Sequence, residues 1–265
     1  MRALCLVLTL LLILPRLSAA EEIEVDVELF LAVDVSRSMN PYELEIQRQG
    51  YASALTAPAV VSAIQNGLLG RIALTYVEWA GVGSQNVVVP WTMVQTEAEA
   101  AEVARAITAH FDDAMRRTSI SSALMYAAES IETNDFLGLR RVIDVSGDGP
   151  NNMGRPVTRA RDYALSKGII INGIPLMTRD AFSERWGIDD LDEYYRRCVI
   201  GGPGAFVIPV LDWDAFAEAV RRKLVLEIAG QLPQVTRVAS HTPAPYNCMI
   251  GEEIWEANRH LFALP

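Results

Sequence analysis

One short stretch constrains this chain more than any other: an apolar run that ends abruptly in oxygen-bearing side chains. Residues 27–33 read Val-Glu-Leu-Phe-Leu-Ala-Val, and Asp34, Ser36 and Ser38 follow at alternate positions. An apolar run of this length, bounded by polar residues, is typical of a strand covered on both faces of a sheet. Because ligands bind at the carboxyl ends of strands in open α/β sheets, the stretch predicts a site at the end of the first strand.

The rest of the chain alternates strand and helix patterns. With 265 residues, of which 51% are hydrophobic, it can build one core and one domain. The alternation predicts an α/β fold with a doubly wound, mostly parallel, six-stranded sheet and helices on both faces. Pro90 marks the third strand as an antiparallel edge strand. The six predicted strands cover residues 24–33, 71–79, 86–91, 140–146, 169–174 and 205–210.

The two ends of the chain differ from this pattern. Residues 1–20 combine a basic start, an apolar core and small residues before a cut after Ala20, as in a secretory signal peptide. The apolar run is short for a membrane span of about 20 residues, although an uncleaved anchor is the alternative. The predicted domain covers residues 21–230, and residues 231–265 form a proline-containing C-terminal tail with one helix near its end.

The cysteines bear on the compartment. Cys5 lies in the signal segment, which leaves Cys198 and Cys248 in the exported protein. Export favours oxidation, so we expect a disulfide between these two, with separate buried thiols as the alternative. The site residues are therefore expected to work in a periplasmic or secreted protein.

Two more polar loops complete a set of hard oxygen donors. Thr118 precedes a predicted helix, and Asp148 follows the strand at 140–146. Carboxylates and hydroxyls suit Mg²⁺, Mn²⁺ or Ca²⁺, whereas zinc favours His and Cys. Each Asp or Ser alone is also a common helix cap or turn residue, so the metal interpretation rests on the whole set. The predicted metal ligands are Asp34, Ser36, Ser38, Thr118 and Asp148.

Other chemistry finds little support. The net charge of −10 is dispersed along the chain, which argues against nucleic acid as a partner. The three histidines lie far apart in the sequence, and neither a Gly-x-Ser-x-Gly elbow nor a Walker-type phosphate loop is present. No catalytic residue is predicted.

Three motifs in order resemble those of von Willebrand factor type A (vWA) domains. Residues 34–38 resemble the Asp-x-Ser-x-Ser signature, residues 118–124 the Thr loop that runs into a helix, and residues 142–149 the strand that ends in Asp-Gly. Together these motifs form that superfamily's metal-ion-dependent adhesion site (MIDAS). Within the superfamily the chain is most similar to an uncharacterised bacterial group of exported vWA-like proteins, a domain of unknown function. It departs from many relatives in having Arg116 and Arg117, where glycine is common, before Thr118.

The resemblance implies a function and leaves two alternatives open. It implies a non-enzymatic binding module in which a partner's acidic group completes the coordination of Mg²⁺, Mn²⁺ or Ca²⁺. The first alternative is a metal-assisted hydrolase or phosphatase with Asp34 as nucleophile, but that chemistry wants a second carboxylate where Ser36 stands. The second is a structural fold that keeps the site without using a metal.

Overall fold

The structure, a computed structural model, describes residues 22–109, 115–178, 186–230 and 245–262. A five-stranded sheet forms its centre, in the order β3-β2-β1-β4-β5. Only β3 runs antiparallel to its neighbour, at the edge of the sheet, as Pro90 predicted. The strands are β1 (Ile23–Asp34), β2 (Ile72–Trp79), β3 (Gln85–Val94), β4 (Phe136–Gly147) and β5 (Ile170–Pro175).

The predicted sixth strand is wrong as a regular strand. Residues 205–210 make only isolated bridges, from Val207 to Gly173 of β5 and from Val210 to Leu176, the residue after β5. The ladder is interrupted where the side chain of Asn172 accepts the Phe206 N–H at 3.0 Å, in the place of a backbone carbonyl. The α/β class is confirmed, with five strands in the described part of the chain rather than six.

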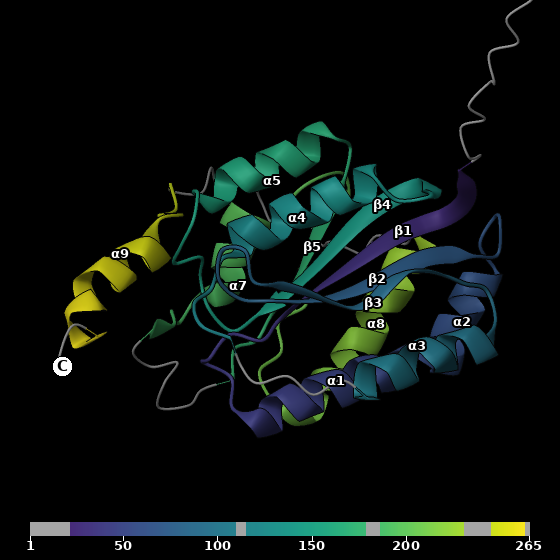
Figure 1. Cartoon of the computed structure of the whole chain (residues 1–265), viewed down its shortest axis with the longest axis horizontal. Coiled ribbons are helices and arrows are strands. Elements are labelled where there is room, and N and C mark those ends of the chain that lie inside the picture. The colour runs from purple at the N-terminus through teal and green to yellow at the C-terminus, as the bar shows by residue number, and fades with distance from the viewer. Residues whose placement is uncertain (1–21, 110–114, 179–185, 231–244, 263–265) are drawn as a thin grey trace, which may run out of the picture.

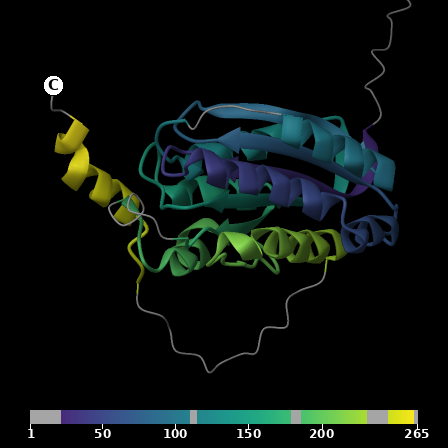
Figure 2. The same ribbon diagram turned by 90° about the horizontal axis from the view of Figure 1, so that it is seen from below.

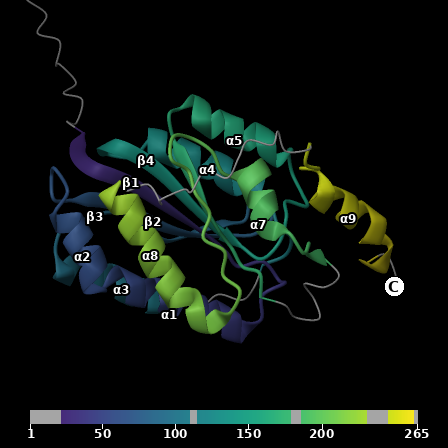
Figure 3. The same ribbon diagram turned by 180° about the vertical axis from the view of Figure 1, so that it is seen from behind.

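Helices cover both faces of the sheet. Figures 1 and 3 show α4, α5 and α7 on one face and α1, α2, α3 and α8 on the other, where α8 lies beside α1 and α2. Alternate residues of β1 enter the two cores, with Leu29 and Leu31 on the α1 and α8 side and Phe30 on the α4 side. The helices are α1 (Pro41–Leu55), α2 (Pro58–Gln65), α3 (Glu97–Ala109), α4 (Ile120–Glu132), α5 (Val157–Ser166), α7 (Leu191–Tyr194), which continues as a π-helix (Tyr195–Val199), α8 (Phe216–Ala229) after a 3₁₀ turn (Trp213–Ala215), and α9 (Ile250–Asn258), which ends in a 3₁₀ turn (Arg259–Phe262).

A capping box fixes where α1 begins. Asn40 Oδ1 accepts the N–H groups of Tyr42 and Glu43, and Glu43 Oε2 accepts the Asn40 N–H at 2.8 Å. Pro41 occupies the first helical position, where its missing N–H is no loss. The loop between β1 and α1 is therefore short and held at both ends.

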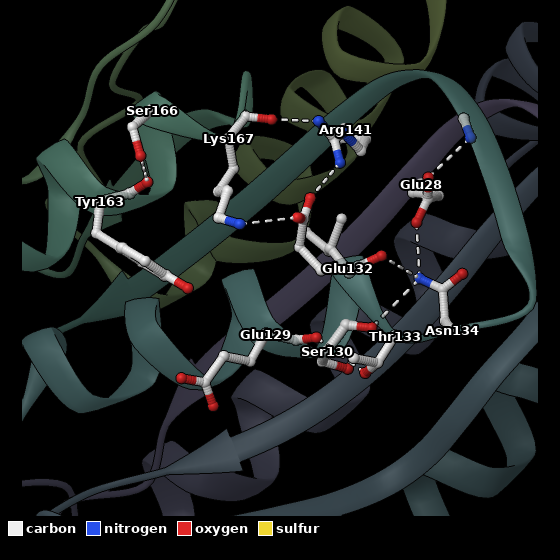
Figure 4. Close-up of polar contacts among 12 residues, drawn as sticks. Glu28, Glu129, Ser130, Glu132, Thr133, Asn134, Arg141, Tyr163, Ser166 and Lys167 are labelled. Atoms are coloured by element: carbon white, nitrogen blue, oxygen red, sulfur yellow. Dashed lines mark hydrogen bonds and ion pairs between the residues drawn. The ribbon is translucent and has the colours of Figure 1, made fainter.

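A second polar cluster ties α4, β4 and α5 together in the half of the sheet away from the carboxyl ends (Figure 4). Glu28 on β1 accepts hydrogen bonds from Asn134 Nδ2 and from the Gly138 N–H, both at 2.7 Å. Glu132 pairs with Arg141 at 2.5 Å and with Lys167 at 3.1 Å. The hydrogen bonds from Asn134 and Gly138 satisfy Glu28, the one carboxylate that interrupts the apolar run of β1.

An ionic cluster is buried between α8 and the sheet. Lys223 Nζ lies 2.7 Å from Asp144 Oδ1 on β4 and also pairs with Glu227 one turn along α8. Asn172 Nδ2 donates to Glu227 at 2.8 Å. All three charged side chains are almost fully buried, so α8 is held to the sheet by polar as well as apolar contacts.

The C-terminal helix is attached at the end of the domain. Cys198 and Cys248 form the expected disulfide, with Cα atoms 5.5 Å apart. Figures 1 and 2 show α9, which follows Cys248 in the sequence, projecting from one end of the domain. The described residues include no helix with the length and apolarity that a membrane crossing requires.

Candidate functional site

The site lies where β1 and β4 end side by side. The register pairs Val33 with Ser146, which brings Asp34 level with Gly147. The sheet is extended on one side of β1 by β2 and on the other by β4, so the direction of winding reverses between β1 and β4. This is the switch point at which an open α/β sheet offers a crevice.

Asp34 lies at the floor of the site and organises the first loop. Its side chain is fully buried, and Oδ1 accepts the Ser36 N–H at 2.7 Å, which turns the chain sharply after the strand. Gln47 of α1 donates to the Asp34 carbonyl at 2.9 Å. A side chain at Gly147 would place its Cβ 2.9 Å from Asp34 Oδ2, so the neighbouring strand must end in glycine to admit this carboxylate.

A chain of hydrogen bonds joins the first and third loops. Ser36 Oγ lies 2.9 Å from Ser38 Oγ, and Ser38 Oγ donates to Asp148 Oδ1 at 2.8 Å. The first loop also contacts the second, because the Met115 N–H donates to the Val35 carbonyl at 2.9 Å. The hydroxyls and the carboxylate are thus held on one small surface.

Thr118 is positioned by the third loop. Its N–H donates to Asn152 Oδ1 at 3.1 Å, and its carbonyl accepts the Asn152 N–H at 3.0 Å. Ser119 is the N-cap of α4, and its side chain accepts the Ser122 N–H. Asn152, which the sequence analysis did not single out, thus fixes the threonine loop.

All five predicted site residues come together. Ser36, Ser38, Thr118 and Asp148 line one cavity of about 420 Å³, and Asp34 lies directly beneath it. No cluster of three or more His, Cys, Asp or Glu side chains that could hold a metal occurs in the described ranges. Any cation here would therefore be held by two carboxylates and hydroxyls.

The electrostatics of the floor favour a cation. Burial raises the pKa of Asp34 well above its usual range, and the neighbouring charge of Asp148 raises it further, against the opposing effect of the Ser36 N–H. Asp34 Oδ2 is buried and accepts no hydrogen bond within the described part of the chain. A buried carboxylate oxygen without a donor, beside a second carboxylate, fits a site made for a hard cation.

The sequence did not predict the wall of the cavity. Trp186 and Trp255, from segments far apart in the chain, stack with ring centroids 5.4 Å apart and an interplanar angle of 28°. Arg117 lies over the Trp255 ring at 3.2 Å. Trp255 belongs to α9, so the C-terminal tail forms one side of the site, and its only signal in the sequence was the Cys198–Cys248 pair.

α9 also contacts the third loop directly. Asn151 Nδ2 donates to Glu252 Oε1 at 2.7 Å, and a Cβ on Gly251 would lie 2.1 Å from the Asn151 carbonyl oxygen. Asn151 Oδ1 in turn accepts the Ser121 N–H at 2.9 Å. The second loop, the third loop and the tail helix are linked through this one asparagine.

Comparison with known proteins gives one matching family. The sequence profile of a family described as "Protein of unknown function (DUF1194)" matches residues 24–232. No curated protein matches the chain by sequence.

Solved structures with a vWA fold resemble the domain. A von Willebrand factor type A structure from Catenulispora acidiphila has a TM-score of 0.52 at 15% identity, covering 77% of this chain and 43% of that one. The pilus adhesin SpaC from Lactobacillus rhamnosus GG has a TM-score of 0.57 at 12% identity, covering 78% and 31%.

A third structure, proximal thread matrix protein 1 from the mussel byssus with a zinc-occupied MIDAS motif, has a TM-score of 0.53 at 15% identity, covering 79% and 49%. The chain thus spans about half the length of the mussel protein. The fold is that of a vWA-like module.

Proposed function

The chain belongs to DUF1194, a family of proteins of unknown function, and from the site that it carries we propose a metal-dependent docking module that works outside the cytoplasm. In this proposal the domain holds a divalent cation, Mg²⁺, Mn²⁺ or Ca²⁺, and an acidic group of a protein partner completes its coordination. The ligand set is Asp34, Ser36, Ser38, Thr118 and Asp148.

The observation that carries the proposal is the state of Asp34. Among the described residues no donor reaches its buried Oδ2 atom, and the pKa of Asp34 is raised by burial and by Asp148. A cation would neutralise both carboxylates and replace the missing donor. The two carboxylates balance the charge of a divalent cation and the other ligands are neutral hydroxyls, so a coordination position that they leave open can accept an acidic oxygen from outside.

The five proposed ligands would contact the cation from different sides. Ser36 and Ser38 are joined in one hydrogen-bonded row with Asp148, and this row lines the cavity where a partner's carboxylate would enter. Asp34 would contact the cation from beneath the cavity floor. Thr118 faces the same cavity from the second loop.

The hydrolase alternative has little support in this geometry. A nucleophilic Asp34 would need contact with a substrate, but its side chain is fully buried and does not line the cavity. Ser36 occupies the position at which that chemistry wants a second carboxylate.

The proposed location rests on the disulfide and on the N-terminal segment. A disulfide such as Cys198–Cys248 persists in oxidising compartments. The signal peptide predicted at residues 1–20 lies outside the described residues. Both features support a periplasmic or secreted protein.

A capture experiment tests the proposal. The protein is immobilised and exposed to the envelope fraction of its source cell, once in millimolar Mg²⁺ and once in EDTA. We expect a partner that is retained only with Mg²⁺, is lost with Ser36→Ala, and is lost when its own carboxylates are amidated beforehand. Ser53→Ala, at an exposed position on α1, serves as the matched control. A partner retained equally in EDTA would contradict the proposal.

A further inference from the structure

The backbone of Arg117 adopts a conformation that few residues other than glycine accept. Its φ is 76°, in the left-handed region, where L side chains other than Asn and Asp are rare. The loop cannot move away easily, because the Arg116 carbonyl packs against Gly81, where a Cβ would lie only 2.8 Å from it. An arginine at such a position is explained better by its side chain than by its backbone.

The Arg117 side chain packs against α9, the tail helix. The Arg117 guanidinium carbon lies 3.2 Å from the centroid of the Trp255 ring, a cation–π contact at stacking distance. Trp255 is itself stacked on Trp186. Behind this stack, α9 is fixed by the close approach of Gly251 to Asn151 and by the Cys198–Cys248 bond. The guanidinium is therefore held at the cavity wall before any ligand arrives.

The same guanidinium has no counter-ion within the described part of the chain. Among the described residues its partner is the Trp255 ring rather than a carboxylate. Arg37 and Arg116 line the cavity as well. Three arginines thus meet two carboxylates at this site, and a bound divalent cation would add to the positive excess.

We propose that Arg117, stacked on Trp255, is a second anion-binding group beside the cation. The site would then bind an acidic peptide segment that has two neighbouring acidic side chains. One carboxylate would complete the cation's coordination, and this part rests on the proposed function. The other would accept the planar N–H groups of Arg117, whose fixed orientation reduces the entropy lost on binding. A cavity of about 420 Å³ has room for such side chains but not for a folded domain.

The test compares two short peptides on the full chain in millimolar Mg²⁺. Both are acetylated and amidated; one reads Gly-Glu-Gly-Gln-Gly and the other Gly-Glu-Gly-Glu-Gly, because alternate residues of an extended chain share a face. Two equivalent glutamates alone would give about a twofold tighter Kd by statistics. We expect the second peptide to bind about tenfold tighter, measured by isothermal titration calorimetry.

Variants assign the difference to Arg117. Arg117→Gln should reduce the ratio of the two Kd values to the statistical value of about two. Arg117→Gly should do the same, and it also removes the backbone strain, so a loss of selectivity cannot be ascribed to misfolding. Arg105→Gln, which removes the same charge from an exposed position on α3, should keep the full ratio. Trp255→Leu should also lower the ratio of the two Kd values, since it removes the ring on which the guanidinium stacks.

The outcomes separate this inference from the proposed function. If the one-glutamate peptide binds only with Mg²⁺ but the wild-type ratio is about twofold, the second anion-binding group is wrong and the docking module stands. If Arg105→Gln lowers the ratio as much as Arg117→Gln, the effect is one of general charge and the inference is also wrong. If neither peptide binds in Mg²⁺, the proposed function fails and this inference fails with it.

Discussion

Ser38 Oγ donates a hydrogen bond of 2.8 Å to Asp148 Oδ1, joining two loops that lie 110 residues apart in the sequence. The bond holds the ends of β1 and β4 in one arrangement, and it places a hydroxyl and a carboxylate at the mouth of the same cavity. Below them, Asp34 is buried beside Asp148, so two carboxylates oppose each other's ionisation at the floor of the site.

Replacing Asp34 should expose this conflict between stability and binding. Asp34→Asn keeps the acceptor for the Ser36 N–H and removes a buried charge, so in EDTA the free energy of unfolding should rise by about 1 kcal/mol. In millimolar Mg²⁺ the order should reverse, because the cation stabilises only the protein that binds it. Urea denaturation in both buffers measures this. Asp162→Asn, at a largely exposed side chain, is the control, and a variant less stable than wild type in EDTA would contradict the account.

The buried cluster on α8 should make stability depend on pH. Burial raises the pKa of Glu227 from 4.5 to about 7, against the opposing effect of Lys223. Between these two values the folded protein binds a proton that the unfolded chain has released, so Glu227 makes the protein less stable as pH rises from about 4.5 to about 7.

Glu227→Gln keeps the acceptor for Asn172 and should remove this contribution. Its free energy of unfolding should exceed that of the wild type at pH values above 7 and approach it near pH 4.5. Denaturation curves across that pH window, with exposed Glu218→Gln as the control, give the comparison. Parallel pH profiles for Glu227→Gln and wild type would show that Glu227 does not carry this titration.

A single methyl group should detach the tail helix. Gly251→Ala would place a Cβ 2.1 Å from the Asn151 carbonyl oxygen, a contact that can be relieved only by moving α9. Hydrogen exchange should then accelerate in α9 and in residues 150–152, but not in α8. Gly149→Ala adds the same methyl where nothing lies within 4 Å and should leave exchange unchanged. Equal protection of α9 in both variants would mean that the helix is not packed as described.

Loss of the disulfide should lower the stability of the protein without loosening the central sheet. Cys198 and Cys248 close a loop of 50 residues, and replacing both by Ala should lower the free energy of unfolding by about 3 kcal/mol. We expect α9 to lose its protection in hydrogen exchange while β1 and β4 keep theirs. The same change on reducing the wild type would support the assignment, and an unchanged α9 would show that its other contacts suffice.

The first strand and its loop could be predicted because their signals are local. Apolar residues from Val27 to Val33 followed by spaced oxygen donors indicate both a buried strand and a site at its end, and the order of the motifs placed Thr118 and Asp148 nearby. The helix start at Asn40 and Pro41 was equally visible, since a capping box is written within four residues.

What could not be predicted depends on contacts between distant segments. One example is the contact between Trp255, Trp186 and Arg117. It depends on the disulfide and on the Asn151–Glu252 hydrogen bond, which hold the tail against the domain, and no local sequence pattern indicates it. The sequence around Lys223 likewise carries no local sign that this residue pairs with Asp144 inside the protein. The sixth strand failed for a similar reason, because Asn172 interrupts its pairing with a side chain.

Titration calorimetry of Mg²⁺ and Mn²⁺ into the full chain tests the central claim most directly. The account predicts one binding site in the wild type, an affinity at least about tenfold weaker after Ser36→Ala or Asp34→Ala, and no change after Ser53→Ala. No detectable binding by the wild type at millimolar metal, or equal binding after Asp34→Ala, would contradict it.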